Sequence, residues 1–342
     1  MGCEVDLVYT WCDAADSVWN AKRMATAQAY GVKVGAPGNT ACRFAAHDEI
    51  LYSLRSAECC VPWVRKVFLV VDDDITPPAW LRLDHPKLRI VRLSEIMPSA
   101  FLPCFCSGTI EHHLARIPDL SEHFLYSNDD TMFGRPLAPS FFFAADGCPY
   151  FRFGGKRKPT PDGMKTVYQC NIERADSLIR SECGSPGREL SAALSRNPHH
   201  CIDAYRKSDM MECYARHSEV LEQSFAFPFR SPDKVQRIIY AYDAILRGRG
   251  HFRLARSGIS GNRPWYKRLL KPGYAESLQF VGKGIYSAER AIAKWRPQLL
   301  CLNGSDIYTD ADYAFLTRLQ TRLYPRPSSF ELEGMASRKD VC

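Results

Sequence analysis

The sequence lacks any apolar run long enough to cross a lipid bilayer. None of its hydrophobic stretches approaches the roughly 20 residues that a membrane-spanning helix needs. The first residues, MGCEVDLVYTWCD, include Glu4 and Asp6 but no basic segment followed by an apolar one, which a secretory signal requires. We therefore expect a cytoplasmic protein.

Several catalytic motifs are missing as well. The sequence has no His-Glu-x-x-His, G-x-S-x-G, P-loop or G-x-G-x-x-G segment. Their absence removes the usual support for a zinc protease, a serine hydrolase, a P-loop ATPase and a dinucleotide-dependent dehydrogenase. The sequence also has no internal repeat, coiled coil or low-complexity tract.

Cysteine, in contrast, is abundant, with 14 residues among 342. Pairs such as Cys59-Cys60 and Cys104/Cys106 lack the spacing of a zinc site or a redox C-x-x-C. In a reducing cytoplasm, this pattern predicts free and mostly buried thiols.

The net charge of +7 is mild and is concentrated at 155–159 and 247–271. Such stretches are either plain solvated surface or attract an anionic sugar phosphate, a membrane surface or a nucleic acid. Phe252, Trp265 and Tyr266 interleave with the second stretch, but Gly and Pro interrupt it and no nucleic-acid-binding module is recognisable. We expect no nucleic-acid partner and favour an anionic polymer or a membrane surface.

Strand-like and helix-like segments alternate along the first part of the chain. Apolar, β-branched runs predict strands at 5–11, 64–74, 88–96 and 123–130. Helical spacing of apolar residues at 47–58 and 107–117 predicts helices between them. This order indicates an α/β fold, Rossmann-like, with a mostly parallel central sheet flanked by helices.

The later chain is harder to interpret. Pro, Gly and aromatic clusters in 135–199 predict loops or an insertion over the sheet. Helical patterns return at 203–226 and 235–248. A strand within 297–306 and a helix at 310–323 follow, and the last dozen residues are expected to fray.

Acidic residues follow several of the predicted strands. Asp13, Asp72 and the Asp129-Asp130 pair come directly after three of them. In parallel sheets, ligands bind at the carboxyl ends of strands, so these acids could share one crevice. With Asn128, the pair suits a hard cation such as Mg²⁺, although a plain turn explains a single acidic strand end equally well.

A second group of polar residues is basic. His199 and His200 lie in RNPHHCIDAYRKSD, and Arg230 lies in FPFRSPDK. A histidine suits a general base for a sugar hydroxyl, and an arginine suits a phosphate because its planar fork binds bidentately. The alternative for each histidine is an ordinary surface or core residue.

Together these segments resemble the Stealth proteins in four blocks that occur in the family's order. DLVYTWCDAADSVW (6–19) is similar to the first block. RFAAHDEIL and its continuation (43–81), with SGTIEHHLARIPDLSEHFLYSNDDTMFG (107–134), is similar to the second. HCIDAYRKS through FPFRSPDK (200–234) resembles the third, and LLCLNGSD through LYPRPSSFE (299–331) the fourth.

The match includes departures from the family pattern. Cys12 stands where valine is usual, and His47 stands where an Asn or Asp usually precedes the next acid. Gly304 replaces the acid that normally follows Asn303, so that Asp306 is the nearest substitute.

The resemblance implies a hexose-1-phosphoryltransferase. The family includes bacterial capsular polysaccharide phosphotransferases and the animal enzyme that places N-acetylglucosamine-1-phosphate on lysosomal mannose. Such an enzyme passes a sugar-1-phosphate from a UDP-sugar, typically a UDP-N-acetylhexosamine such as UDP-N-acetylglucosamine, to a saccharide hydroxyl. UMP leaves, and a phosphodiester joins the two sugars. A role in capsule or exopolysaccharide synthesis, with peripheral association at the inner membrane face, follows as an expectation.

The resemblance and the chemistry of phosphoryl transfer together suggest roles for individual residues. The expected metal ligands, for Mg²⁺ or alternatively Mn²⁺, are Asp129 and Asp130. The expected catalytic residues are His200 as general base, Arg230, Asp13 and Glu111. The expected donor-binding residues are Thr10, Trp11, Asp16, Arg43, Arg55, Ser107 and Asn303. Glu49 lies in the second block and is expected to orient the sugar or the metal.

The four blocks and the patterns between them divide the chain into four parts. Residues 1–134 form the nucleotide-sugar-binding core, and 135–199 form an insertion that contributes the acceptor region. Residues 200–331 complete the catalytic domain, and 332–342 form a tail.

Two other functions stay open. A conventional metal-dependent glycosyltransferase would have similar strand-end acids but would release UDP rather than UMP. A non-catalytic sugar-nucleotide-binding protein would keep the blocks only for the fold.

Overall fold

The computed structural model describes residues 3–33, 35–36, 39–161, 163–255, 257–260, 276–280 and 282–334. The basic stretch predicted at 247–271 lies partly outside the described residues, including Trp265 and Tyr266. The end of the predicted tail, 335–342, also lies outside them.

A five-stranded sheet forms the centre of the molecule, in the order β3-β2-β1-β4-β8. Its strands are β1 (Val5–Thr10), β2 (Val67–Val71), β3 (Leu88–Arg92), β4 (His123–Asn128) and β8 (Asp203–Arg206). The first four run parallel, and β8 is antiparallel to β4. The expected α/β fold with a mostly parallel sheet is therefore confirmed.

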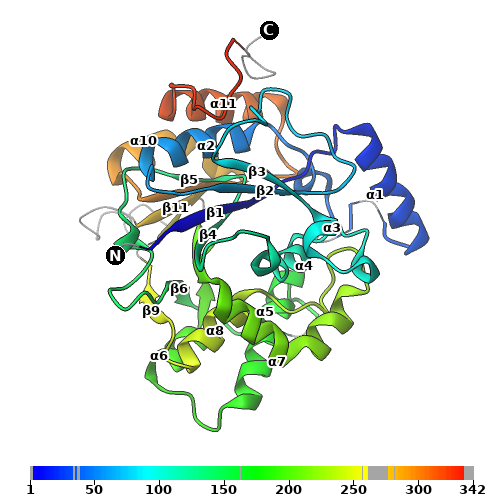
Figure 1. Cartoon of the computed structure of the whole chain (residues 1–342), viewed down its shortest axis with the longest axis vertical. Helices are drawn as coiled ribbons and strands as arrows, with labels where there is room; N and C mark the ends of the chain where they lie inside the picture. Colours follow the sequence, from blue (N-terminus) through cyan, green and yellow to red (C-terminus); the bar gives the residue numbers. More distant parts are fainter. Residues whose placement is uncertain are drawn as a thin grey trace.

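Helices cover both faces of this sheet, which explains why its strands are continuous apolar runs. Side chains alternate along β1, so that Leu7 and Tyr9 pack into one core and Val8 into the other. One face is covered by α2 (Glu49–Cys60), α10 (Ala288–Trp295) and α11 (Asp310–Leu323), and the other by α4 (Ser107–Glu111), α5 (Val167–Glu182), α6 (Arg188–Leu194), α7 (Lys207–Phe225) and α8 (Ile238–Leu246) (Figure 1).

Two smaller sheets extend the centre. In the sheet ordered β10-β11-β12-β5, the strands are β10 (Ser257–Ser260), β11 (Ser277–Phe280), β12 (Leu299–Leu302) and β5 (Thr131–Phe133). The sheet ordered β7-β6-β9 contains β7 (Arg196–Pro198), β6 (Tyr150–Lys156) and β9 (His251–Leu254). Because β5 follows β4 after a two-residue turn, its pairing with β12 brings a distant segment to the end of the central sheet.

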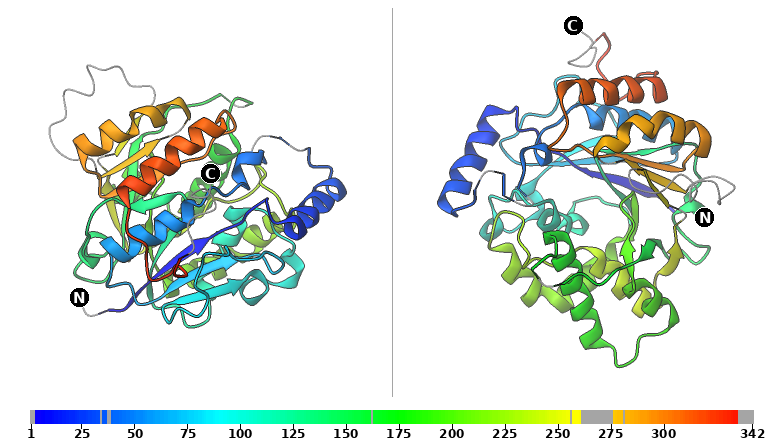
Figure 2. Two further views of the ribbon diagram at one scale, coloured as in Figure 1. Left: turned by 90° about the horizontal axis from the view of Figure 1, so that it is seen from above. Right: turned by 180° about the vertical axis from the view of Figure 1, so that it is seen from behind.

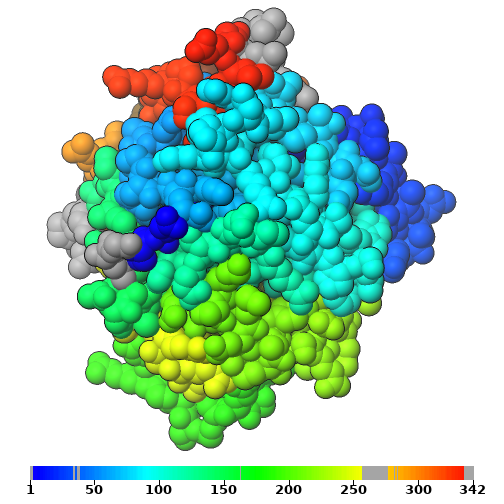
Figure 3. Space-filling view, viewed as in Figure 1, coloured from blue at the N-terminus to red at the C-terminus, as the bar shows by residue number. Residues whose placement is uncertain are grey.

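The remaining elements are short or peripheral. They are α1 (Ser17–Ala29), α3 (Leu93–Ile96) and 3-10 turns at Ala41–Arg43, Ser99–Phe101, Leu114–Arg116, Pro139–Phe141 and Gly282–Ser287. Figure 2 shows α1 projecting at one side of the molecule. In Figure 3, the helical layer in green and yellow abuts the cyan segments between β2 and α4.

The segment 135–199, predicted as loops or an insertion over the sheet, contains β6, α5 and α6. Ala175 and Ile179 lie one helical turn apart and pack into the core, and α5 contacts α8. Thr166 caps the helix by accepting a hydrogen bond from the backbone N–H of Gln169. The Pro- and Gly-rich run before the cap masked this helical pattern in the sequence.

The other predicted elements are close to those observed. The predicted helix at 203–226 begins as β8 and continues as α7, and α8 and α11 occur where helices were expected. The predicted helix at 107–117 is divided into α4 and a 3-10 turn. Every cysteine in the described residues is a free thiol, as predicted. Among the described helices, none is long and apolar enough to cross a bilayer.

Truncating Leu125 should test the central sheet. Its side chain is fully buried on β4, so Leu125→Ala should lower the free energy of unfolding by about 2–5 kcal/mol. Leu83 is 56% exposed, and Leu83→Ala should change it by no more than about 0.5 kcal/mol. Urea denaturation of both variants measures the difference, and equal effects would contradict the assigned burial.

Candidate active site

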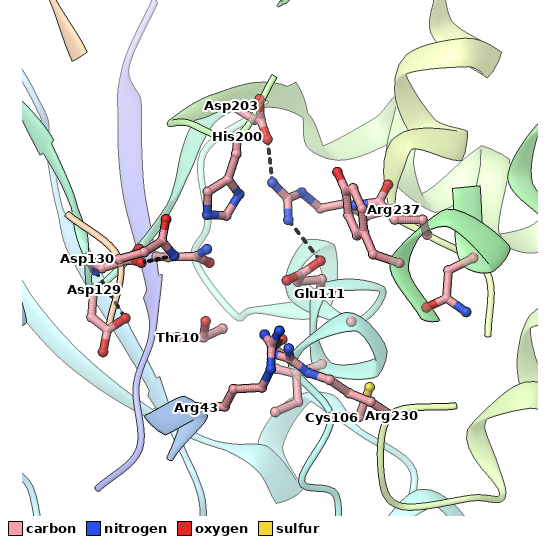
Figure 4. Close-up of a pocket in the computed structure, with 18 of the residues that line it drawn as sticks. Thr10, Arg43, Cys106, Glu111, Asp129, Asp130, His200, Asp203, Arg230 and Arg237 are labelled. Atoms are coloured by element: carbon pink, nitrogen blue, oxygen red, sulfur yellow. Dashed lines mark hydrogen bonds and ion pairs between the residues drawn. The ribbon is translucent and has the colours of Figure 1, made fainter. Parts of the chain in front are cut away.

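A pocket of about 950 Å³ lies at the carboxyl ends of β1, β2 and β4. The central sheet, the β6 sheet and the helices α4, α5 and α8 all contribute to its walls (Figure 4). The predicted site residues that line it are Thr10, Trp11, Arg43, Ser107, Glu111, Asp129, Asp130, His200, Arg230 and Asn303. The structure thus brings together residues from all four of the sequence blocks.

Three carboxylates meet at one wall of this pocket. Asp129 and Asp130 form the turn after β4, and Glu49 reaches them from the first turn of α2. Removal from solvent raises the pKa of all three carboxyl groups, and the negative charge of a neighbour raises each of them further. The cluster therefore favours a proton or a cation at its centre.

Asp130 is the best anchored member of the cluster. Its Oδ2 accepts a hydrogen bond from Asn303 Nδ2 at 2.8 Å, and its backbone oxygen accepts one from the N–H of Leu302 at 3.0 Å. Its Oδ1 is buried and has no hydrogen-bond partner among the described residues. A buried carboxylate oxygen without a donor is a free ligand position, and oxygen ligands from carboxylates suit Mg²⁺ or Mn²⁺. The residues present thus fit the expected cation.

Two arginines line the pocket near each other. Arg230 Nη2 donates a hydrogen bond to Ser107 Oγ at 2.9 Å. Removal from solvent and the positive charge of Arg230 both lower the pKa of Arg43. Among the described residues, no carboxylate oxygen lies within 4.0 Å of either guanidinium. The pair is therefore available for an anionic ligand.

Figure 4 shows His200 between the carboxylates Asp129 and Asp130 on one side and a buried ion-pair network around Arg237 on the other. In that network, the Arg237 guanidinium donates to Glu111 Oε2 at 3.0 Å and also pairs with Asp203. Burial, and secondarily the charge of Arg237, lowers the pKa of His200 to about 4. The imidazole is neutral near pH 7 and can accept a proton.

Three predicted site residues do not line the pocket. Arg55 pairs with Glu331 at 2.6 Å and donates to the backbone oxygen of Tyr324, so it ties α2 to the chain after α11. Asp16 caps α1 by accepting from the N–H of Trp19 at 2.9 Å. Asp13 accepts from the N–H of Ala15 at 2.9 Å. The geometry gives these three side chains local structural contacts.

Asp72, the other strand-end acid, does line the pocket, but it is ion-paired with Lys22. The sequence did not indicate Asp203, which lies within the third block, or Arg237, which follows that block's last residue; neither belongs to a motif of its own. Arg237 directly precedes α8, at its N-cap position, and only its burial and its pairing with two acids distinguish it from a surface arginine at a helix start. The two acids, Glu111 and Asp203, lie 126 and 34 residues from Arg237 along the chain, so spacing in the sequence does not indicate these ion pairs.

Comparisons with known proteins identify the family model and the relatives that this chain matches. Residues 43–151 match the family model for Stealth protein CR2, conserved region 2. The exopolysaccharide phosphotransferase CpsY of Mycobacterium tuberculosis is 35% identical over 255 residues, which cover 72% of this chain and 45% of that protein. An exopolysaccharide phosphotransferase of Streptomyces coelicolor is 33% identical over 347 residues, covering 98% of this chain and 53% of that protein.

More distant similarities were also found. The capsular polysaccharide phosphotransferase SacB of Neisseria meningitidis serogroup A is 28% identical over 335 residues, covering 96% of this chain and 57% of that protein. A solved structure of the galactosyltransferase LgtC with donor and acceptor sugar analogues aligns with a TM-score of 0.44 and 12% identity, over 95% of this chain and 96% of that chain. The chain spans about half the length of the curated relatives that it matches. From the matched region and these relatives, the chain belongs to the Stealth family.

Proposed function

We propose that this chain transfers a sugar-1-phosphate from a UDP-sugar to a saccharide hydroxyl and releases UMP, in the synthesis of a capsule or exopolysaccharide. N-acetylhexosamine-1-phosphate is the proposed transferred group. The observation that carries the proposal is the arrangement of charge in the pocket. Two arginines that have no carboxylate partner among the described residues lie in the same pocket as three clustered carboxylates and a neutral histidine. This set suits a reaction at phosphorus, where positioning and charge neutralisation dominate.

The carboxylates supply the proposed cation site. Asp129 and Asp130, supported by Glu49, would hold Mg²⁺ or Mn²⁺. When bound, such a cation neutralises pyrophosphate charge and polarises the phosphorus–oxygen bonds. Asn303 holds Asp130 in place through its amide.

The other side chains act on the phosphate and the acceptor. Arg43 and Arg230 hold non-bridging oxygens of the transferred phosphate, and Ser107 orients Arg230. His200 accepts the acceptor's hydroxyl proton at a ring nitrogen. The acceptor oxygen then bonds to the phosphorus attached to the sugar, and the bond from that phosphorus to the bridging oxygen breaks. The bridging oxygen leaves with UMP.

Arg237 has a positioning role in this proposal. It links Glu111 on α4 to Asp203 on β8, and its positive charge adds to burial, which is the main cause of the lowered pKa of His200. Cytoplasmic location and peripheral association with the inner membrane face stay predictions.

A conventional glycosyltransferase is the competing function. It would break the bond between C1 of the sugar and oxygen and would release UDP. Two pocket arginines with no carboxylate partner in the described part of the chain favour phosphoryl transfer, and the curated relatives are named phosphotransferases.

Divalent cations should stabilise the folded protein. At a Mg²⁺ or Mn²⁺ concentration 100 times Kd, binding should raise the free energy of unfolding by about 2.7 kcal/mol. Asp129→Asn should remove this gain, because the cluster loses one ligand charge. Thermal unfolding with cation or EDTA measures it, with Asp84→Asn, at an 80% exposed side chain, as the matched control. An equal gain in both variants would contradict the assigned ligands.

The released nucleotide should be UMP. Incubating the chain with UDP-N-acetylglucosamine, a mixture of saccharide acceptors and Mg²⁺ should yield UMP, and EDTA or Asp129→Ala should abolish it. Chromatography of the nucleotides distinguishes the reactions. Release of UDP in place of UMP would contradict the proposal and leave a glycosyltransferase. If neither nucleotide is released, the same assay is repeated with other UDP-sugars as donors.

Two arginine variants should separate donor binding from stability. Arg230→Ala should lower kcat/KM for the donor by about 100-fold, because one guanidinium of the phosphate-binding pair is lost. Arg55→Ala should leave kcat/KM unchanged below its unfolding temperature but lower the free energy of unfolding by about 3 kcal/mol, since it breaks the pair with Glu331. Steady-state kinetics and urea denaturation give both values. A kinetic loss in Arg55→Ala would restore its predicted donor role.

A further inference from the structure

Three side chains of different chemistry converge at the carboxylate wall of the pocket. A carboxylate oxygen of Asp130, a ring nitrogen of His200 and the Sγ atom of Cys301 all lie within 4.8 Å of one another. Asp130 and His200 line the pocket, and Cys301 lies on β12 and is 2% exposed. Figure 4 shows His200 and Asp130 at the same end of the pocket, away from Arg230.

We propose that Asp130, His200 and Cys301 bind a thiophilic transition-metal cation such as Zn²⁺, and that this binding inhibits the transferase. Zn²⁺ takes sulfur, nitrogen and oxygen ligands in a tetrahedral arrangement, often with water as the fourth. Mg²⁺ takes oxygen ligands and does not use a thiolate or an imidazole of this kind. The site is thus distinct in chemistry from the Asp129–Asp130 site, although the two share Asp130.

The surrounding contacts hold the ligands ready. Asn303 Nδ2 donates to Asp130 Oδ2 at 2.8 Å, and the Cys301 thiol donates to Asn303 Oδ1 at 2.9 Å. Within the described part of the chain, Asp130 Oδ1 has no hydrogen-bond partner. One amide therefore orients two ligands, as the groups behind a metal's ligands commonly do.

Binding requires one proton to leave. The Cys301 thiol loses its proton to solvent and becomes the thiolate ligand. Asn303 Oδ1 then loses that donor but still accepts a hydrogen bond from Gln279 Nε2 at 2.8 Å. The amide stays satisfied, so the exchange leaves no new buried acceptor without a partner.

Two other groups in the described residues have a similar spacing but different surroundings. In the group of Cys213, His217 and Asp243, both Asp243 oxygens are already paired with arginines. In the second group, His251 pairs with the exposed Asp146 beside Cys148. By contrast, no arginine or lysine nitrogen lies within 4.0 Å of the Asp130 carboxylate among the described residues.

We expect inhibition because two of the three proposed Zn²⁺ ligands, His200 and Asp130, also have roles in the proposed reaction. A cation on His200 occupies the lone pair that accepts the hydroxyl proton, and a cation on Asp130 competes with Mg²⁺. This consequence rests on the proposed function, whereas the cation site itself does not.

Cadmium tests the site directly on the whole chain. Titrating the reduced protein with Cd²⁺ should produce an ultraviolet thiolate-to-Cd²⁺ absorption band. At saturation, the absorbance of this band should be lower in Cys301→Ser than in wild type by the contribution of one thiolate. Cys106→Ser is the matched control, because Cys106 also is 2% exposed and lines the same pocket but does not belong to the three-residue group. Thermal unfolding of Cys301→Ser and Cys301→Ala identifies any variant that fails to fold.

The same variants test inhibition. With Mg²⁺ present, the Zn²⁺ concentration for half-inhibition of nucleotide release should rise about 10-fold or more in Cys301→Ser and stay unchanged in Cys106→Ser. An identical Cd²⁺ band in wild type and Cys301→Ser would overturn the site. A Cys301-dependent band with unchanged Zn²⁺ inhibition would overturn the inhibitory role. If wild type releases no nucleotide from any of the UDP-sugars tested, the proposed function fails, and the Cd²⁺ band still decides the site.

Discussion

Mutual repulsion among Glu49, Asp129 and Asp130 is the constraint on which the pocket depends. Folding withdraws these three carboxyl groups from solvent and places them side by side, which raises the pKa of each. Such an arrangement costs free energy unless a proton or a cation compensates it. The surrounding fold must therefore hold the cluster rigidly, and groups with perturbed pKa values of this kind concentrate at functional sites.

The positive groups of the pocket are divided between two tasks. Arg237 is neutralised by Glu111 and Asp203, and it stabilises the junction of α4, β8 and α8. Arg43 and Arg230 have no such partners among the described residues, so their charge is available to a ligand. The separation explains how one pocket can contain a rigid ionic framework and an open anion-binding surface.

Chain topology joins these groups from distant parts of the sequence. The turn after β4 carries Asp129 and Asp130 and leads into β5, which pairs antiparallel with β12. Asn303, directly after β12, therefore hydrogen-bonds to Asp130 although the two residues are 173 positions apart in the sequence. The same pairing places Cys301 beside the carboxylate, where its thiol and His200 complete a ligand set that Mg²⁺ does not require.

The sequence by itself determined the central sheet, because buried parallel strands must be apolar runs, and it indicated Asp129, Asp130, His200 and Arg230 through their blocks. It did not indicate α5, whose helical spacing follows a Pro- and Gly-rich run, or the placement of Arg55 beside Glu331. Tertiary structure alone decided which charges are paired. The sequence does not distinguish an arginine that pairs with a carboxylate from one that binds a ligand. Only packing brings an acid from a distant part of the chain within ion-pair distance.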